Sequence, residues 1–318
     1  MVNKTVMLSA FGVALLAGCT PKTAPGNGAP AAPAGKTFVI GYSQSTLQDP
    51  WRKAMNSELE AEEKLHSNVT VNKQDAQNVA STQINQVETL DTQGIDALMI
   101  SPKESGPLTP EVSKIFKKGI PVILLDRGID GPNYTTLVGA DNTLIGKQAG
   151  EYVKSKFPNG ARIVEIAGIP DATATRERAK GFRDGLGDLK KYPIVASQPA
   201  DYKRGPAIDV MNTIVTGNDN IQVVYAHNDE MALGAVKVLK DRGLLKSIAV
   251  IGVDGQNEAI DAVAKGDMAA TFVYPRPGAE GLKAAIAVLE GKKVEKRITL
   301  PTIQITKENA AQYQGKGF

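Results

Sequence analysis

From about residue 37 onward, short apolar runs alternate with longer amphipathic segments along the chain. The runs are rich in β-branched residues, which is typical of buried strands. We expect strands at 38–43, 69–73, 97–101, 122–126, 161–167, 222–226, 248–254 and 268–274. In the intervening segments apolar residues recur at helical spacing. Helices are expected there, for example at 52–66, 80–93, 109–118, 143–156, 176–190 and 230–242.

Glycines mark the ends of several expected helices. Gly94, Gly119 and Gly243 stand where a left-handed cap residue is wanted. Strands that are apolar almost throughout, each followed by a helix, indicate parallel sheets covered on both faces and joined by right-handed crossovers. The expected fold class is therefore α/β.

The pattern also repeats. GIDALMISP followed by GIPVILLDR resembles NIQVVYAHND followed by SIAVIGVDG. The part of the chain that can fold has about 280 residues, more than one core usually organises. We therefore expect two Rossmann-like lobes, with the boundary near residues 139–142.

The first residues predict export. Lys4 precedes the apolar stretch VMLSAFGVALLAGC, which has the length of a signal-peptide core and is too short for a membrane anchor. Its last four residues, LAGC, resemble the lipobox of bacterial lipoproteins, which implies a signal peptide over 1–18 and a lipidated Cys19. The alternative is an ordinary secretory signal in which the cysteine is incidental. Residues 20–36 are almost all Pro, Ala and Gly, so 19–36 should form a lipidated, flexible tether.

Composition narrows the classes of function. Cys19 is the only cysteine, so internal disulfides and a cysteine-based catalytic site are excluded. The net charge of +3 and the 5% of aromatic residues come without a basic block, so no nucleic-acid partner is expected. No further run is apolar enough to predict a transmembrane helix.

Polar groups follow the expected strands at the ends where parallel α/β sheets bind their ligands. One such cluster could be helix capping, but clusters on both sheets predict two lined walls that face each other. The clusters are Ser43–Gln44, Ser101, Asp126–Arg127, 227–229 and Asp254–Gly255.

Catalysis explains these clusters poorly. His66 and His227 are the only histidines, and no G-x-S-x-G nucleophile elbow is present. Zinc and calcium motifs, a phosphate-binding P-loop and a G-x-G-x-x-G dinucleotide loop are also missing. We therefore expect a binding protein rather than an enzyme, with no cofactor and no metal site.

A sugar site explains the same residues better. Sugar hydroxyls need planar donors and acceptors in fixed positions, and the C–H face of the ring needs an aromatic platform. Trp51, in a stretch with the composition of an exposed loop, is the expected platform; its alternative role is core packing. The expected hydrogen-bonding residues are Asp126, Arg127, Arg178, Asn228 and Asp254.

Each candidate has a structural alternative. Asp229 and Glu230 stand where a helix begins, so N-capping or interaction with the helix dipole is expected of them. Only one of Arg176 and Arg178 should point inward, because residues two apart lie on different faces of a helix. The pair Asp254–Gly255 could be a tight turn without a ligand.

Taken together, the motifs resemble the substrate-binding proteins of bacterial sugar ABC importers, type I, of the ribose/galactofuranose-binding family. These motifs are GIPVILLDR, GADN, RERAKGF, SQPADY, YAHNDEMALGA and GVDG, in the order of the family. The resemblance implies two lobes, 37–140 plus 275–300 and 141–274 plus 301–318, joined by a three-segment hinge. It also implies that Tyr202 supplies an aromatic side chain to the sugar.

Other positions in the sequence concern the ligand. Where this chain has Trp51–Arg52, ribose-binding members of the family carry two phenylalanines. Where this chain has Tyr274, they carry a glutamine. The Trp–Arg pair and the preceding GYSQ, which contains Gln44, are more similar to the galactofuranose-binding branch. Galactofuranose, another hexose and a pentose all stay open as ligands. Gln44, Arg52 and Tyr274 complete the expected site.

The resemblance implies a function. We expect a monomeric, lipid-anchored extracytoplasmic receptor that closes on one monosaccharide and delivers it to the permease and ATPase of an ABC importer. The same fold could instead present the sugar to a chemoreceptor or a histidine-kinase ectodomain, or belong to an exported sugar-cleaving enzyme. A related repressor would need a DNA-binding helix-turn-helix where this chain has the lipobox and tether.

Overall fold

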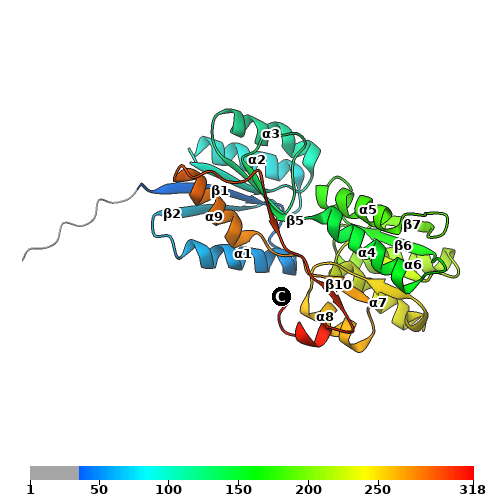
Figure 1. Cartoon of the computed structure of the whole chain (residues 1–318). Helices are drawn as coiled ribbons and strands as arrows, with labels where there is room; N and C mark the ends of the chain where they lie inside the picture. The colour runs from blue at the N-terminus through cyan, green and yellow to red at the C-terminus, as the bar shows by residue number, and fades with distance from the viewer. Residues whose placement is uncertain (1–35) are drawn as a thin grey trace, which may run out of the picture. The chain divides into compact units, whose positions relative to one another are not determined.

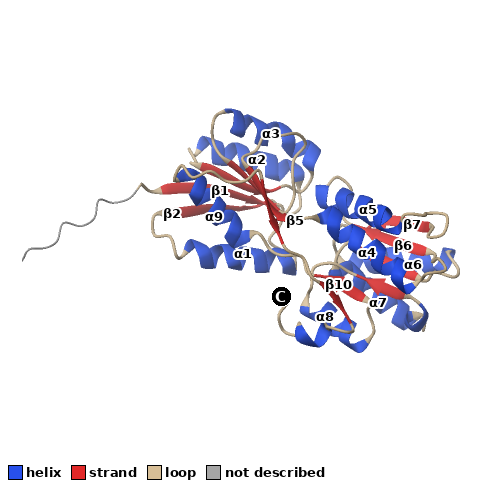
Figure 2. Cartoon of the chain, viewed as in Figure 1, coloured by secondary structure: helices blue, strands red, loops and turns tan. Residues whose placement is uncertain are grey.

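The computed structural model describes residues 36–318, of which Thr37–Phe318 form one compact unit. The expected signal peptide, the lipidation site at Cys19 and all but the last residue of the tether lie outside the described residues. The compact unit contains two sheets, each covered by helices on both faces (Figures 1 and 2), so the expected α/β fold class is confirmed.

The first sheet belongs to the N-terminal lobe, and every strand pair in it is parallel. Its strand order is β11-β5-β4-β3-β1-β2. Helices α1 (Pro50–Glu63) and α9 (Gly278–Leu289) pack together on one face, and α2 (Ala80–Thr92) and α3 (Ser105–Lys117) cover the other. The strands are β1 (Phe38–Gln44), β2 (Val69–Asp75), β3 (Ala97–Ser101), β4 (Val122–Leu125), β5 (Thr136–Ala140) and β11 (Arg297–Leu300).

The second sheet belongs to the C-terminal lobe and has the order β12-β10-β9-β8-β6-β7. Helices α4 (Asn142–Lys156) and α5 (Thr173–Leu186) cover one face, and α6 (Arg204–Gly217) and α7 (Asp229–Asp241) the other. Helix α8 (Asn257–Lys265) and the short 3-10 helices η1 (Leu245–Ser247) and η2 (Ala310–Gln312) complete the lobe. The strands are β6 (Ile163–Ala167), β7 (Ile194–Pro199), β8 (Val223–Ala226), β9 (Ala249–Ile251), β10 (Ala270–Phe272) and β12 (Gln304–Thr306).

One feature of the second sheet differs from the expected parallel arrangement. Strand β12 runs antiparallel to β10, at the edge of the sheet. An antiparallel edge strand on an otherwise parallel sheet is common in large α/β folds. The chain reaches β12 directly from β11 of the other lobe, so no helical crossover sets its direction.

All eight expected strands are present, most of them one to four residues shorter than predicted. Strands β5, β7, β11 and β12 were not predicted. The last three are short or half-exposed and lack the continuous apolar run that identifies a buried strand. The expected capping glycines are confirmed, since Gly94, Gly119 and Gly243 have φ angles of 75°, 86° and 70°.

Three connections within residues 36–318 join the lobes. They run from β5 to α4, from β10 to α9 and from β11 to β12. In Figure 1 the last of them passes from the N-terminal lobe down to the C-terminal lobe. Since parallel strands of both sheets end at the junction, their following loops meet there.

Helices α4 and α5 touch backbone to backbone. A Cβ atom on Gly181 would lie 2.1 Å from the carbonyl oxygen of Thr143, and one on Gly146 would lie 2.3 Å from that of Arg178. Such distances are far inside van der Waals contact, so only glycine fits at these crossings. The close packing fixes α5, which carries Arg178 to the junction of the lobes.

Candidate ligand-binding cleft between the lobes

A cleft between the lobes has an empty volume of about 350 Å³, part of which is open to solvent. All of the sequence-predicted binding residues except Gln44 line it, from loops and helices of both lobes. Asp49 and Ala174 were not predicted. The lining residues are Asp49, Trp51, Arg52, Asp126, Arg127, Ala174, Arg178, Tyr202, Asn228, Asp254 and Tyr274.

Trp51 lies in the first turn of α1 and not in an exposed loop, so that part of the sequence interpretation was wrong. Asp49 caps the helix by accepting a hydrogen bond from the Arg52 amide at 2.8 Å, and Pro50 takes the first helical position. An aspartate followed by proline is a helix-start signal, which could have located both Trp51 and Asp49.

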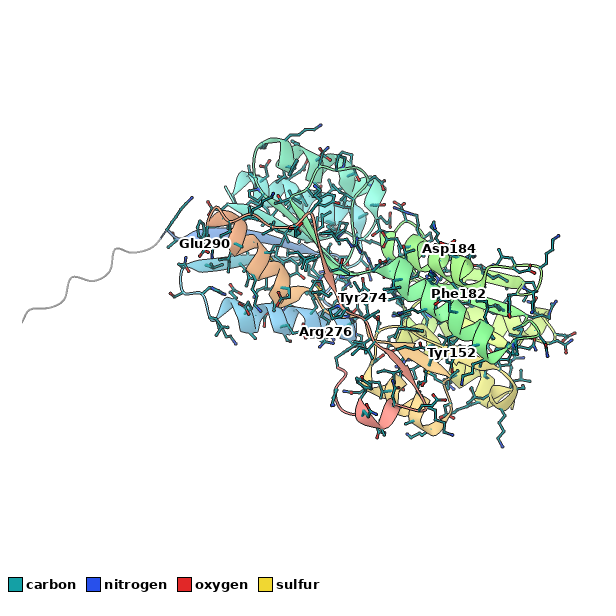
Figure 3. The ribbon with its side chains drawn as sticks, viewed as in Figure 1. Tyr152, Phe182, Asp184, Tyr274, Arg276 and Glu290 are labelled. Atoms are coloured by element: carbon teal, nitrogen blue, oxygen red, sulfur yellow. The ribbon has the colours of Figure 1, made fainter. Side chains whose placement is uncertain are left out.

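The indole of Trp51 is only 7% exposed. Its Nε1 donates to the carbonyl oxygen of Tyr274 at 3.0 Å, and the two rings lie 5.3 Å apart at 36°. Figure 3 shows Tyr274 where the two lobes meet. The two aromatic residues therefore form one side of the cleft, next to the connections between the lobes.

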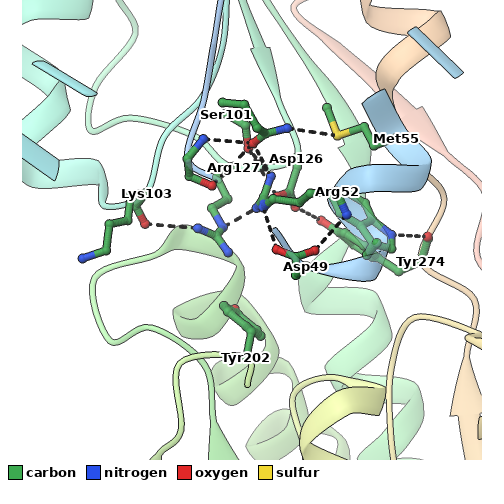
Figure 4. A network of polar contacts seen from close by, with 12 residues as sticks. Asp49, Arg52, Met55, Ser101, Lys103, Asp126, Arg127, Tyr202 and Tyr274 are labelled. Carbon is green, nitrogen blue, oxygen red and sulfur yellow. Dashed lines mark hydrogen bonds and ion pairs between the residues drawn. The ribbon is translucent and has the colours of Figure 1, made fainter. Parts of the chain in front are cut away.

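The N-terminal wall is built around Asp126 (Figure 4). Its Oδ2 accepts from Arg52 Nη2 at 2.7 Å, and its Oδ1 accepts from the Tyr274 hydroxyl at 2.6 Å. Burial opposes the charge of the carboxyl, but Arg52 and Arg127 outweigh it and lower the pKa of Asp126. Both carboxylate oxygens of Asp126 therefore have protein partners.

Gln44 lies behind this wall. Its Oε1 accepts from Arg52 Nη1 at 2.6 Å, and the same nitrogen donates to Ser101 Oγ at 2.8 Å. Gln44 is fully buried and does not line the cleft. Gln44 therefore holds the Arg52 guanidinium in position and does not face the cleft itself.

Arg127 offers donors to the cleft. Its Nη1 donates to the carbonyl oxygen of Lys103 at 3.3 Å, and its guanidinium lies 5.1 Å from the centre of the Tyr202 ring. Its Nε is buried and makes no hydrogen bond within residues 36–318, but it forms an ion pair with Asp126 Oδ2 at 3.6 Å. The nearby carboxylate offsets part of the cost of burying this donor.

The C-terminal wall carries a second cation. Arg178 Nε donates to Asn142 Oδ1 at 2.8 Å, and its Nη1 donates to the carbonyl oxygen of His227. Its guanidinium lies 4.3 Å from the centre of the Tyr274 ring. Arg178 is 2% exposed, whereas Arg176 lies at the rim of the cleft, 44% exposed in its side chain.

His227 is a structural residue. Its Nε2 lies 3.1 Å from Glu165 Oε1, and Glu165 also accepts from Arg183 and from Ser197. Burial lowers the pKa of His227, against the pull of Glu165. The side chain points away from the cleft, and only its carbonyl oxygen serves the site, by holding Arg178.

The N-cap of α7 is Asn228, so the capping alternative for Asp229 and Glu230 was wrong; both lie in the first turn, where they interact favourably with the helix dipole. Asn228 Oδ1 accepts from the Met231 amide at 3.0 Å, and its Nδ2 donates to the carbonyl oxygen of Tyr202 at 3.2 Å. Asp229 instead accepts from the Gln256 amide at 2.8 Å and from Thr271 Oγ1 at 2.7 Å. Asp229 thereby supports the loop that carries Asp254.

Asp254 has no hydrogen-bond partner for its carboxylate among the described residues. Burial raises its pKa well above the usual value, although Arg178 acts in the opposite direction. Asp126 and Asp254 therefore differ in chemistry: the first is already paired by the protein, and the second is an acceptor without a partner.

Three lining residues have positive φ angles: Asp126 (66°), Tyr202 (62°) and Asp254 (136°). Such backbone conformations cost a non-glycine residue about 1–3 kcal/mol each and cluster at functional sites. Here they come from both lobes and direct three side chains into one cleft.

Residues 36–318 contain neither a membrane-spanning helix nor a cluster of metal ligands. No helix there combines the length and apolar character needed to span a bilayer. No group of three or more histidine, cysteine or acidic side chains in that range could hold a metal ion.

Known proteins resemble the chain over most of its length. It is 39% identical to the ribose import binding protein of Bacillus subtilis (strain 168), over 84% of this chain and 86% of that protein. It is 32% identical to the galactofuranose-binding protein of Escherichia coli (strain K12), over 72% of this chain and 75% of that protein.

A solved structure, the fructose-binding periplasmic domain of a hybrid two-component system, has a TM-score of 0.84 and 34% identity, covering 88% of this chain and 94% of that one. The family model described as periplasmic binding protein domain matches residues 40–293. The resemblance inferred from the motifs is confirmed: the chain belongs to the periplasmic binding protein domain family.

Proposed function

We propose that this chain is an extracytoplasmic solute-binding lipoprotein that holds one monosaccharide in the cleft and delivers it to an ABC importer. The observation that carries the proposal is the set of unpaired polar groups in the cleft. Among residues 36–318 the Asp254 carboxylate has no hydrogen-bond partner, and Arg127 Nε makes no hydrogen bond although Asp126 Oδ2 lies 3.6 Å away. A polyol ligand supplies both the donor and the acceptor that these groups lack.

The apolar side of the cleft supports a sugar in particular. Trp51 and Tyr274 present ring surface beside the charged groups. A sugar ring has a face of C–H bonds that packs on such a surface, while its hydroxyls point to the rim of the ring. An anion or an amino acid could bind to the arginines of the cleft, but it would have no C–H face to pack on the rings of Trp51 and Tyr274.

The class of sugar is a pentose or a hexose, in a furanose or a pyranose ring. Identity over the whole chain is higher with the ribose import binding protein than with the galactofuranose-binding protein. The Trp51–Arg52 pair in the cleft instead favours the galactofuranose branch. Residues that touch the ligand bear on the choice more directly than whole-chain identity, which also counts surface and core positions.

The test is a panel of sugars. Thermal unfolding of the chain is followed with D-ribose, D-galactose, D-fructose, L-arabinose and myo-inositol, and calorimetry measures the affinity of any sugar that raises the melting temperature. A ligand at 100 times its Kd stabilises by about 2.7 kcal/mol. Chromatography of the recovered sugar distinguishes binding from cleavage. A panel without any shift, or a cleaved sugar, contradicts the proposal.

A second candidate is a sensor. It is supported by the similarity to the fructose-binding domain of a hybrid two-component system. The two roles separate in cells: deletion of a transport receptor abolishes uptake of the sugar, whereas deletion of a sensor abolishes the transcriptional response and leaves basal uptake in place.

The proposed membrane anchor has its own test. Cys19→Ser removes the thiol that lipidation requires, so the chain should move from the membrane fraction to the soluble extracytoplasmic fraction. Retention of the Cys19→Ser variant in the membrane fraction would contradict the anchor and would leave sugar binding untouched.

A further inference from the structure

The two lobes make hydrogen bonds to each other outside the ligand cleft. The contact lies where the N-terminal end of α5, in the C-terminal lobe, meets the N-terminal end of α3, in the N-terminal lobe. Asp171, just before α5, is the centre of this contact. Neither Asp171 nor its neighbours Thr173 and Arg176 line the cleft.

Asp171 completes the cap of a helix in the other lobe. Glu104, at the N-cap position of α3, makes no side-chain cap hydrogen bond. Instead the carbonyl oxygen of Asp171 accepts from the Ser105 amide at 3.1 Å, and its Oδ2 accepts from the Gly106 amide at 3.0 Å. Two amides that a helix start leaves without partners are thus satisfied across the gap between the lobes.

Two further side chains reinforce the contact. Thr173 Oγ1 accepts from the Gly128 amide, in the β4–β5 loop, at 2.9 Å. Arg176 Nη2 donates to Ser105 Oγ at 2.9 Å and to Asp130 at 3.3 Å, while its Nη1 holds Asp171 Oδ1 at 2.7 Å. Each of these residues therefore links one lobe to the other.

The other rim of the cleft is different. There Thr46, Gln48 and Asn78 of the N-terminal lobe face residues 201–204 across an open hollow with an empty volume of about 730 Å³. No hydrogen bond among the described residues joins these two groups. The lobes are therefore joined by hydrogen bonds at the Asp171 contact and not across this hollow.

We infer that Asp171, Thr173 and Arg176 form an interlobe latch that sets how tightly and how long the ligand is held without touching it. The inference rests on the proposed function, because a receptor that closes on a sugar retains it only while the lobes stay together. In the open state the amides of Ser105, Gly106 and Gly128 return to water. The latch therefore stabilises the closed form by the difference in free energy between these hydrogen bonds within the protein and the hydrogen bonds that the same groups make to water.

The test uses three latch variants of the full chain: Asp171→Ala, Thr173→Val and Arg176→Ala. For a sugar of the panel that binds, each variant should weaken affinity and speed release. For Asp171→Ala the loss should be roughly 2- to 30-fold, the range for losing a helix cap. Stopped-flow fluorescence of Trp51 measures the release rate, and calorimetry measures the affinity.

Lys180→Ala is the matched control. Lys180 lies on the same helix, is exposed and pairs with Asp184 within the helix. Its removal should leave affinity and release unchanged. The melting temperature of each ligand-free variant separates a folding defect from a loss of the latch, since the latch links two lobes that fold around separate sheets.

Amide hydrogen exchange provides a readout that does not depend on sugar affinity. Exchange at Gly106 should be faster in Asp171→Ala than in the unaltered chain to the extent that the lobes are closed, and the difference should be largest with sugar bound. If the unaltered chain binds no sugar of the panel, the proposed function fails, and exchange at Gly106 still decides on the latch. If Asp171→Ala binds and releases sugar like the unaltered chain and Gly106 exchanges at the same rate, the latch is overturned while sugar binding stands.

Discussion

At the scale of residues, the cleft separates two aspartates that look alike in the sequence. Asp126 and Asp254 both follow strands, and both have a positive φ. The carboxylate of Asp126 is paired with Arg52 and Tyr274, whereas that of Asp254 meets no hydrogen-bond donor among the described residues. We therefore propose that Asp126 mainly supports the wall and that Asp254 binds the ligand.

The first prediction concerns Asp254. Asp254→Ala should weaken sugar affinity by roughly 10- to 100-fold, because ligand hydroxyls would lose a charged acceptor inside a closed cleft. Isothermal titration calorimetry measures the effect. The control is Asp261→Ala, at a half-buried aspartate on α8 outside the cleft that accepts from Gln314, and it should bind like the unaltered chain. Unchanged affinity in Asp254→Ala would remove this residue from the site.

The second prediction concerns pH. Burial raises the pKa of Asp254 in the empty cleft, so below that pKa the carboxyl carries a proton. Ligand hydroxyls donate to the charged form and lower the pKa, so binding releases a proton. Affinity should therefore fall as pH decreases through the raised pKa, and level off above it.

Calorimetry in buffers of different ionisation enthalpy counts the released protons. Asp254→Asn cannot titrate and should show a flatter pH dependence than the unaltered chain. Asp229 lies nearby, and burial raises its pKa to about 7, so Asp229→Asn is the second control. Equal slopes in the unaltered chain and Asp254→Asn would assign the proton to another group.

At the scale of elements, the position of Arg178 depends on the contact between α4 and α5. The third prediction is that Gly181→Ala costs about 1–3 kcal/mol of stability, as overpacking does, because its Cβ would meet the Thr143 carbonyl oxygen at 2.1 Å. Sugar affinity should also fall, since α5 must move away from Asn142, the partner of Arg178. Urea unfolding and calorimetry measure the two effects.

Gly205→Ala is the matched control for this change. Gly205 lies in the first turn of α6 with nothing within 4 Å of its would-be Cβ. Since alanine favours helices over glycine by about 1 kcal/mol, this variant should be as stable as the unaltered chain or more so. A Gly181→Ala variant with full stability and affinity would show that the helices can separate without cost.

At the scale of the whole molecule, the site exists only while both lobes contribute to it. Trp51 and Arg127 come from one lobe, and Arg178 and Asp254 from the other. A ligand that contacts both walls shifts the equilibrium toward the closed form. The fourth prediction is therefore that saturating sugar decreases the radius of gyration measured by small-angle X-ray scattering.

The Asp254→Ala variant should need more sugar for the same decrease, and Lys180→Ala should need no more than the unaltered chain. An unchanged radius of gyration at saturating sugar would mean that the cleft binds without closure. That result would contradict the proposed hinge motion but not the proposed binding of sugar in the cleft.

Sequence reasoning reached Asp126, Arg127, Asn228 and Asp254 because strand ends can be read locally, whereas Arg52, Tyr202 and Tyr274 came from the resemblance to the family. It missed Asp49, although an aspartate before a proline marks a helix start, and it placed Trp51 in a loop for the same reason. It could not tell that Gln44 supports Arg52 from behind, since the orientation of a side chain after a strand depends on neighbours far along the chain. The latch at Asp171 had no sequence signal at all.

The sequence by itself determined the alternation of strands and helices, the two-lobed α/β fold and the polar residues at the strand ends. These follow from the spacing of apolar positions, which acts over a few residues. Only the tertiary structure decided that β12 runs antiparallel, that Asp126 is paired and Asp254 is free, and that Asp171 reaches α3. The reason is distance along the chain. Tyr274 donates to Asp126 across 148 positions, and no local sequence pattern specifies which distant donors will bind to a given carboxylate.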